Sequence, residues 1–439
     1  MSNKTGRVLS NRSIVVSAAL VVLLAAGAAW LLLANFGGGS EADRARLDAI
    51  RTVGSLVLGA GGAIALLLAA RRQQTAERDL AQKEQVQRHA EQDAAERRIT
   101  ELYLKAVDQL GSDKAPVRLA ALHALERVGQ SNPAQRQTIV DVICAYLRMP
   151  YTAPTTHPVG PRRLGYRRPV RPGHPLPAHR PSVSVPVRDS ANAAQQEREV
   201  RLTAQRILIT HLSPGDDGSR PVDTFWPDID VDLSGATLID FGLIGGRIRK
   251  AWFDEASFVG FTTFDRTEFA GAASFQRATF AGEAWFAEAK FSRDAAFFGA
   301  EFAEQAMFTD VEFAEEAGFN LAEFASAAFA GSKFVGSASF AGVKFTEYAF
   351  FVGAAFVDGA QFDSAIFIAE ADFSDAEFSG IFYFRQTEFA SVNFGSAAVR
   401  TDAEVVPAMW PLGWTVSNDP AEVRPGHAGS WTRLVPPSR

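Results

Sequence analysis

The sequence predicts a solenoid of short repeats, because one residue type recurs at a fixed spacing over a long stretch. From residue 253 to residue 394, phenylalanines follow one another in steps of five and six that mostly alternate, so the unit is eleven residues. Most have a small residue, usually alanine, two positions earlier. Helices repeat apolar residues every three or four positions and half-buried strands every two, so neither explains this spacing, whereas a fixed internal repeat is typical of solenoids. The lattice consists of Phe253, Phe258, Phe264, Phe269, Phe275, Phe280, Phe286, Phe291, Phe297, Phe302, Phe308, Phe313, Phe319, Phe324, Phe329, Phe334, Phe340, Phe345, Phe351, Phe356, Phe362, Phe367, Phe373, Phe378, Phe384, Phe389 and Phe394.

The repeat starts earlier, as true fives centred on Leu233, Leu238, Leu243, Ile248 and Phe253. With a large apolar residue at each centre and a small residue two before it, residues 229–395 resemble the pentapeptide-repeat family. The resemblance implies a mainly β fold, a right-handed quadrilateral parallel β-helix, for which we take the bounds 225–395. Four centres would make one coil, giving about eight coils spaced ~4.8 Å apart. One inward ladder would then contain Phe275, Phe297, Phe319, Phe340, Phe362 and Phe384.

The phenylalanines are predicted to form the structural core, with alanine as the spacer that lets them stack in a close-packed interior. The alternation is interrupted where Phe324, Phe329 and Phe334 follow in consecutive fives. The coil from Phe319 to Phe340 is therefore one residue short, and we expect a change of coil shape there.

Two uncharged apolar runs near the N-terminus predict a transmembrane hairpin. Residues 14–34 and 53–70 contain no charged residue, and the first run would extend about 32 Å as a helix, enough to cross a bilayer. Ser55, Gly59 and Ala63 would place small residues on one face for membrane packing. The alternative for the first run is a cleaved signal peptide. Basic residues outside both runs predict a multi-pass cell-membrane protein with residues 1–13 and the C-terminus cytoplasmic.

Residues 71–149 predict a helical segment. The stretch VRLAALHALERVGQ resembles a HEAT-type repeat, and together with VICAYLR and RLTAQRILITHL it resembles the helical segment of membrane-anchored bacterial pentapeptide-repeat proteins. Residues 150–190 contain many prolines and arginines and predict an extended linker. A further helix is expected over 195–212.

Aromatic residues flank the repeats and predict caps, because a solenoid must cover its end coils. Phe225 and Trp226 precede the first coil, and Trp410 and Trp414 follow the last, within a C-terminal cap and tail over 396–439. The alternative for the C-terminal aromatics is a ligand or homodimer surface.

No motif predicts catalysis. The chain lacks a nucleophile elbow, a phosphate-binding glycine loop, a Cys/His zinc cluster and a dinucleotide fingerprint. We therefore expect no enzyme activity, no cofactor and no metal. His123 and Glu126 are three residues apart, but without a second ligand pair they predict only a contact on a helix surface. The single cysteine, Cys144, excludes an internal disulfide and is predicted to be a buried small apolar residue.

Charge is the strongest functional signal. The chain has a net charge of −6, but residues 228–393 contain 26 acidic and ten basic residues, a net charge of −16. We expect a non-catalytic, membrane-anchored scaffold that binds an unidentified, basic protein partner and does not bind nucleic acid directly. One alternative is a DNA mimic that binds or inhibits DNA gyrase, as some family members do, through Glu268, Glu301, Glu312, Glu323 and Asp372. Another is that the helical segment is the binding module and the β-helix is a spacer.

Overall fold

The computed structural model describes residues 40–152, 186–215, 222–401, 410–411, 413–417 and 430–436, with a few residues between 23 and 34. The chain divides into two compact units, residues 1–97 and 98–439, and each is described by itself. Most of the predicted first membrane span, residues 14–34, and most of the predicted linker, residues 150–190, lie outside the described residues.

One long helix, α2 (Glu41–Leu110), contains the second apolar run, residues 53–70. Ser55 is exposed on α2, where its hydroxyl donates to the carbonyl of Thr52 (2.8 Å). Gly59 and Ala63 also lie in α2, and their side chains are outside the description. Among the described residues, no helix combines the length and the apolar character needed to cross a membrane.

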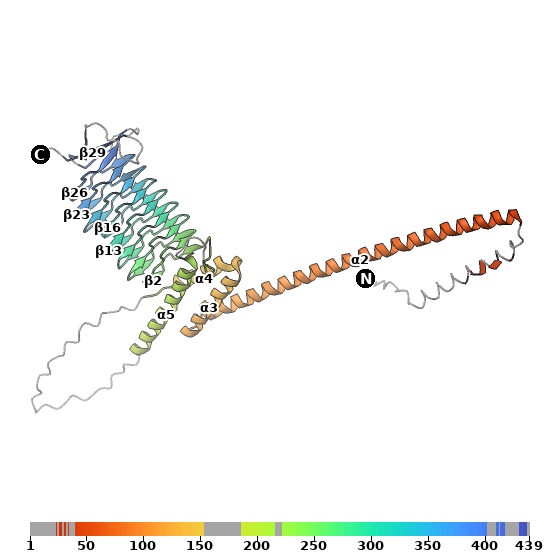
Figure 1. Cartoon of the computed structure of the whole chain (residues 1–439). Coiled ribbons are helices and arrows are strands. Elements are labelled where there is room, and N and C mark those ends of the chain that lie inside the picture. The colour runs from red at the N-terminus through yellow and green to blue at the C-terminus, as the bar shows by residue number, and fades with distance from the viewer. Residues whose placement is uncertain are drawn as a thin grey trace, which may run out of the picture. The chain divides into compact units, whose positions relative to one another are not determined.

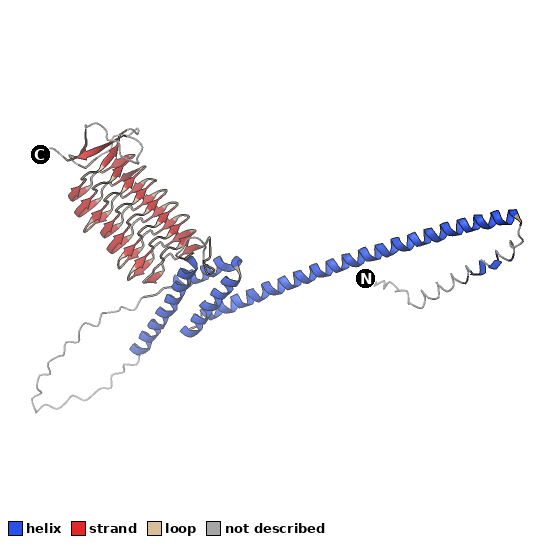
Figure 2. Cartoon of the chain, in the orientation of Figure 1, coloured by secondary structure: helices blue, strands red, loops and turns tan. Residues whose placement is uncertain are grey.

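The second unit contains a parallel β-solenoid of eight coils, as the repeat predicts (Figures 1 and 2). Each full coil has four sides, and each side pairs in parallel with the same side of the neighbouring coils. The first face contains β1 (Asp230–Asp232), β4 (Lys250–Trp252), β8 (Ala273–Ser274), β12 (Ala295–Ala296), β15 (Ala317–Gly318), β18 (Ala338–Ser339), β22 (Gly359–Gln361) and β25 (Ile381–Tyr383).

The second and third faces share one sheet, because several strands run around the corner between them. This sheet contains β2 (Thr237–Ile239), β5 (Ser257–Val259), β6 (Thr262–Thr263), β9 (Thr279–Phe280), β10 (Ala284–Trp285), β13 (Glu301–Met307), β16 (Glu323–Ala328), β19 (Lys344–Phe345), β20 (Ala349–Phe350), β23 (Ile366–Asp372) and β26 (Glu388–Asn393). The fourth face contains β3 (Arg247–Ile248), β7 (Glu268–Phe269), β11 (Lys290–Phe291), β14 (Glu312–Phe313), β17 (Lys333–Phe334), β21 (Ala355–Phe356), β24 (Glu377–Phe378) and β27 (Ala398–Arg400).

The phenylalanine lattice lies inside the coils as four ladders of stacked rings. The predicted ladder is confirmed: from Phe275 to Phe384, successive ring centroids are 4.9, 4.8, 5.0, 4.9 and 4.9 Å apart, with the rings nearly parallel. All lattice phenylalanines are buried except Phe389, which is half-buried. Rings in neighbouring ladders meet edge to face, as Phe291 and Phe297 do at 6.0 Å. Such stacked and edge-to-face contacts add stability beyond the burial of apolar area.

A tight turn explains why five-residue steps alternate with six-residue steps. After Phe275, the N–H of Ala278 donates to the carbonyl of Phe275 (3.1 Å), and Arg277 has a positive φ of 53°. This geometry is that of a type II turn, which needs a residue with positive φ at its third position. The same turn recurs every eleven residues, for example from Phe297 to Ala300. The tight turn makes every second corner compact, and each of the remaining corners, such as the one after Phe280, takes the additional residue.

The shortened coil changes its outer corner and leaves the core intact. Phe302 pairs with Phe324, 22 residues later, but Gln305 pairs with Ser326, 21 residues later. The missing residue is therefore at the corner between the second and third faces. The rings of Phe302 and Phe324 remain stacked at 4.6 Å, so the predicted change of shape is confined to this corner.

Helices close the N-terminal end of the solenoid. They are the end of α2, then α3 (Ala115–Ser131), the short 3-10 helix η1 (Pro133–Gln135), α4 (Arg136–Leu147) and α5 (Pro186–Leu212). Asn132 does not cap the following helix through its side chain; its amide donates instead to the carbonyl of Val128 in α3. Cys144 is buried in α4, and burial raises the pKa of its thiol to about 12.

Two glutamines pair with the exposed strand edges of the first coil. Gln137 of α4 donates its side-chain N–H to the carbonyl of Asp230 and accepts the N–H of Asp230, both at 2.9 Å. Gln205 of α5 does the same with Ile239, at 2.8 and 3.0 Å. A side-chain amide carries one donor and one acceptor side by side, like a peptide group. Each glutamine thus replaces the neighbouring strand that β1 and β2 lack.

Trp226 joins the helices at this end and is buried. Its ring stacks on His211 of α5 at 3.8 Å, and its N–H donates to Gln130 of α3 at 2.9 Å. Gly129 provides the necessary space, since a β-carbon there would lie 2.6 Å from the indole ring. Phe225, the other predicted cap residue at this end, is also buried.

Aromatic rings and an antiparallel hairpin cover the C-terminal end. Trp410 stacks on Phe382 (5.8 Å), and Trp414 contacts Phe394 edge to face (4.9 Å). Strand β29 (Trp431–Val435) pairs antiparallel with β27 and with β28 (Thr415–Val416). Phe382 occupies a position that alanine fills in the preceding coil, opposite Ala360, and so widens the apolar end on which Trp410 lies.

Candidate interaction surface

Among the described residues, no group of three or more His, Cys, Asp or Glu side chains is arranged to hold a metal ion. His123 and Glu126 are in contact at 3.0 Å, and Glu126 also contacts His211 at 3.1 Å. His211 in turn hydrogen-bonds the carbonyl of Thr224 at 2.6 Å. These contacts link α3, α5 and the segment before the first coil, so their role is to hold these parts of the structure together.

Many acids of the solenoid are held by the solenoid itself. Asp254, Asp265 and Asp363 follow lattice phenylalanines, and each accepts a backbone N–H from the next coil, at 3.0, 2.8 and 2.9 Å. Other acids pair with arginine across neighbouring coils, as Glu255 does with Arg277. The charge of −16 therefore overstates the number of carboxylates available to a partner.

The fourth face is balanced in charge along its length. Arg247, Glu268, Lys290, Glu312 and Lys333 occupy equivalent positions in five successive coils and alternate in sign. Opposite charges on adjacent strands stabilise one another. This face has little net charge to offer a charged partner.

The third face carries acids without any base. We define it as residues 260–263 (with β6), 282–285 (with β10), 304–307 of β13, 326–328 of β16, 347–350 (with β20), 370–372 of β23 and 391–393 of β26. All these residues are described, and none is lysine or arginine. None of its acids forms an ion pair within residues 222–401. The acids of this face are Glu283, Glu304, Glu347, Glu370 and Asp372. Glu347 also accepts a hydrogen bond from the hydroxyl of Ser326 (2.8 Å), and Asp372 accepts from the N–H of Ser374 (2.8 Å) and the amide of Asn393 (3.1 Å), which leaves each with one oxygen unused by these bonds.

The third face also exposes aromatic rings. Phe261, Trp285, Tyr348 and Phe350 are 43%, 37%, 49% and 36% exposed. Phe261 and Trp285 meet edge to face at 5.2 Å, and Tyr348 stacks on Phe350 at 5.8 Å. Contact with its own neighbours orients each ring, and carboxylates lie beside them: the N–H of Trp285 donates to Glu283 at 3.2 Å.

The five acids that the DNA-mimic alternative requires do not form one row. Glu268 and Glu312 are on the fourth face, Glu301 and Glu323 on the second, and Asp372 on the third. Lys290 and Lys333 flank Glu312, and Lys344 pairs with Glu323. The pattern differs from a regular line of phosphates.

The sequence did not lead us to expect the aromatic residues of the third face, because within the repeats we expected phenylalanine only in the core. A signal was present, because Phe261 and Phe350 lie off the lattice. Comparisons of the chain with protein-family models, with curated proteins and with solved structures found no match.

Proposed function

We propose that this protein is a non-catalytic protein–protein interaction scaffold of the pentapeptide-repeat type, and that its third face binds a basic segment of a partner protein. The observation that carries the proposal is the combination of five carboxylates, four exposed rings and no cation on one side of a rigid sheet. The stacked-coil fold with its phenylalanine spacing supports the family assignment.

Arginine is the side chain that best fits such a surface. Its planar guanidinium stacks on aromatic rings and forms paired hydrogen bonds with carboxylates. On the third face Glu347 is next to Tyr348, and Glu370 occupies the position equivalent to Tyr348 in the following coil. A guanidinium lying on the Tyr348 ring would therefore have carboxylates within reach on two coils.

A labelled hexa-arginine peptide, followed by fluorescence anisotropy, tests the surface directly. We expect the full chain to bind it at low salt and more weakly at high salt, because exposed charges are screened. Replacing Glu347 and Glu370 together by glutamine should weaken binding about fivefold, since each exposed ion pair contributes up to about 1 kcal/mol. Trp285→Ala should weaken it about threefold.

The matched control replaces Glu268 and Glu312 of the fourth face by glutamine, which changes the net charge by the same two units. Because Arg247, Lys290 and Lys333 flank these acids, we expect less effect from the control pair. Equal losses in the two double variants would show attraction by net charge alone and would refute a specific third-face site.

The proposed scaffold is tethered to a membrane by residues 14–34 and 53–70, with the solenoid cytoplasmic. The support is the uncharged, apolar sequence of both runs. After alkaline carbonate extraction of cells that make the full chain, we expect the protein in the membrane pellet and a variant without residues 14–70 in the supernatant. Release of the full chain by carbonate would refute spanning helices.

A further inference from the structure

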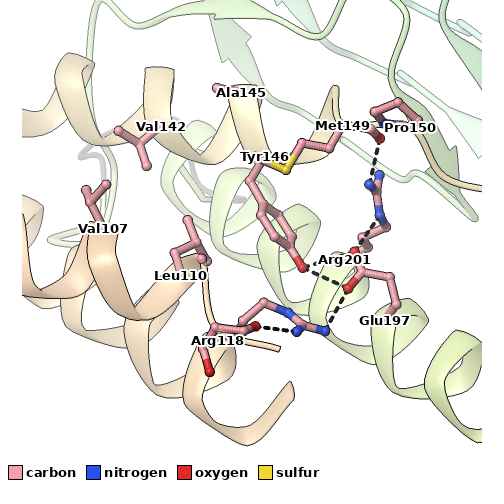
Figure 3. Close-up of a pocket in the computed structure, with 12 residues that line it drawn as sticks. Val107, Leu110, Arg118, Val142, Ala145, Tyr146, Met149, Pro150, Glu197 and Arg201 are labelled. Atoms are coloured by element: carbon pink, nitrogen blue, oxygen red, sulfur yellow. Dashed lines mark hydrogen bonds and ion pairs between the residues drawn. The ribbon is translucent and has the colours of Figure 1, made fainter. Parts of the chain in front are cut away.

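The helices at the N-terminal end line an open cavity of about 540 Å³ (Figure 3). Its apolar walls come from Val107 and Leu110 of α2, Val142 and Ala145 of α4, and Met149 and Pro150 after α4. All lining residues belong to the second unit. The volume is within the range of small-molecule sites, which are mostly apolar with a few placed polar groups.

The polar groups of the cavity gather around the carboxylate of Glu197 on α5 (Figure 3). Its oxygens accept from Tyr146 (3.0 and 3.1 Å), from Nε of Arg201 (2.9 Å) and from Arg118 (2.8 Å). Burial and the nearby carboxylate raise the pKa of Tyr146 to about 12, so its hydroxyl remains a donor. Glu197 is thus fully occupied by its neighbours.

Two guanidinium groups and one carboxylate line the cavity, which leaves an excess of one positive charge. The side chain of Arg201 is 2% exposed, and that of Arg118 is 13% exposed. Arg201 also donates to the carbonyls of Leu147 (2.9 Å) and Met149 (2.7 Å). The excess positive charge attracts an anion, and the attraction is stronger at a partly buried site than in bulk water.

Arg118 has unused hydrogen-bonding capacity toward such an anion. One terminal nitrogen donates an N–H to the carbonyl of Ser112 (2.6 Å) and the other donates an N–H to Glu197, which leaves a second N–H on each terminal nitrogen for an anion. Nε is fully buried without an acceptor among the described residues and does not face the cavity. Arg118 lies in the first turn of α3. This turn contains no acidic residue, and no side chain caps the N-terminus of the helix. The positive end of the helix dipole therefore adds to the attraction for an anion.

We propose that this cavity binds a small amphiphilic carboxylate, with the carboxylate at Arg118 and the apolar chain against the walls from α2 and α4. The apolar lining excludes a fully hydrophilic anion as the best ligand, and the excess positive charge excludes an apolar cation. This site is separate from the third face of the solenoid and does not depend on the function proposed for that face.

Isothermal titration calorimetry of the full chain with octanoate tests the proposal, with octan-1-ol as the neutral probe of equal chain length. We expect one octanoate per chain, bound at least tenfold more tightly than octan-1-ol. Arg118→Met should weaken octanoate binding at least tenfold, whereas Arg127→Gln, at an exposed position on the same helix, should leave it unchanged. Ala145→Phe should abolish binding, because Ala145 is exposed at the cavity and a larger side chain there fills the space without disturbing the core.

Equal affinity for octanoate and octan-1-ol would overturn the proposal, since charge would then play no role. Unchanged octanoate binding by a folded Ala145→Phe variant would also overturn it, because the ligand would be elsewhere. If Arg118→Met does not fold, the Ala145→Phe variant and the comparison of the two probes still decide the question. Absence of octanoate binding at millimolar concentration would refute the site outright.

Discussion

Phe297→Ala is expected to lower the free energy of unfolding by about 3–5 kcal/mol, the usual cost of removing a fully buried phenylalanine. The ring of Phe297 stacks between Phe275 and Phe319, at 4.9 and 4.8 Å, and meets Phe308 edge to face at 5.5 Å. The space left by the missing ring cannot close easily, because the hydrogen bonds between adjacent coils hold the backbone at a fixed spacing. Urea denaturation followed by circular dichroism measures the effect.

Phe298, the residue next to Phe297, supplies the control. Phe298 is 40% exposed and points away from the ladders, so Phe298→Ala should cost about 1 kcal/mol or less. Comparable losses in the two variants would mean that the ladders do not account for the stability of the solenoid.

Gln205→Ala is expected to cost about 2–5 kcal/mol, because it leaves both the N–H and the carbonyl of Ile239 without a partner in a buried site. Gln205 is itself buried, so water cannot readily replace its amide. The variant should also show faster hydrogen exchange at the Ile239 amide. Chemical denaturation and hydrogen exchange by mass spectrometry measure the two effects.

Gln195→Ala is the matched control on the same helix. Gln195 is exposed, and the one hydrogen bond of its amide to another described residue is with Glu199, one turn away, at 3.2 Å. We expect a change below about 0.5 kcal/mol. Unchanged exchange at Ile239 in the Gln205→Ala variant would show that the amide pairing does not protect the edge of the first coil.

The core of the solenoid could be predicted in detail because every lattice position has the same requirement. Each phenylalanine has equivalents one coil before and one coil after, so the spacing of Phe275, Phe297 and Phe319 alone specifies which rings stack. The end helices were also indicated, by the apolar pattern from Val117 to Val128 within α3. Their role at the strand edges was not indicated, because glutamine is ordinary on a helix surface and nothing local marks Gln137 or Gln205.

The candidate surface could be predicted only in part, and the cavity could not be predicted. The acidic excess was visible from composition, but which carboxylates remain available depends on partners one coil away, such as the backbone N–H that Asp265 accepts. The cavity was not visible, because Arg118 and Glu197 are 79 residues apart and meet only through the packing of three helices. Such contacts between distant segments leave no local pattern in the sequence.

Gln137 and Gln205 close one end of the solenoid, and Trp410 and Trp414 cover the other. Neither end therefore depends on how many coils lie between them. A coil of 22 residues inserted in the middle would meet the same neighbours as any present coil and would leave both ends unchanged. Each such insertion would move the C-terminal hairpin about 4.8 Å farther from the helices. The fold is thus a molecular ruler, in which the number of coils sets how far apart the two closed ends are held.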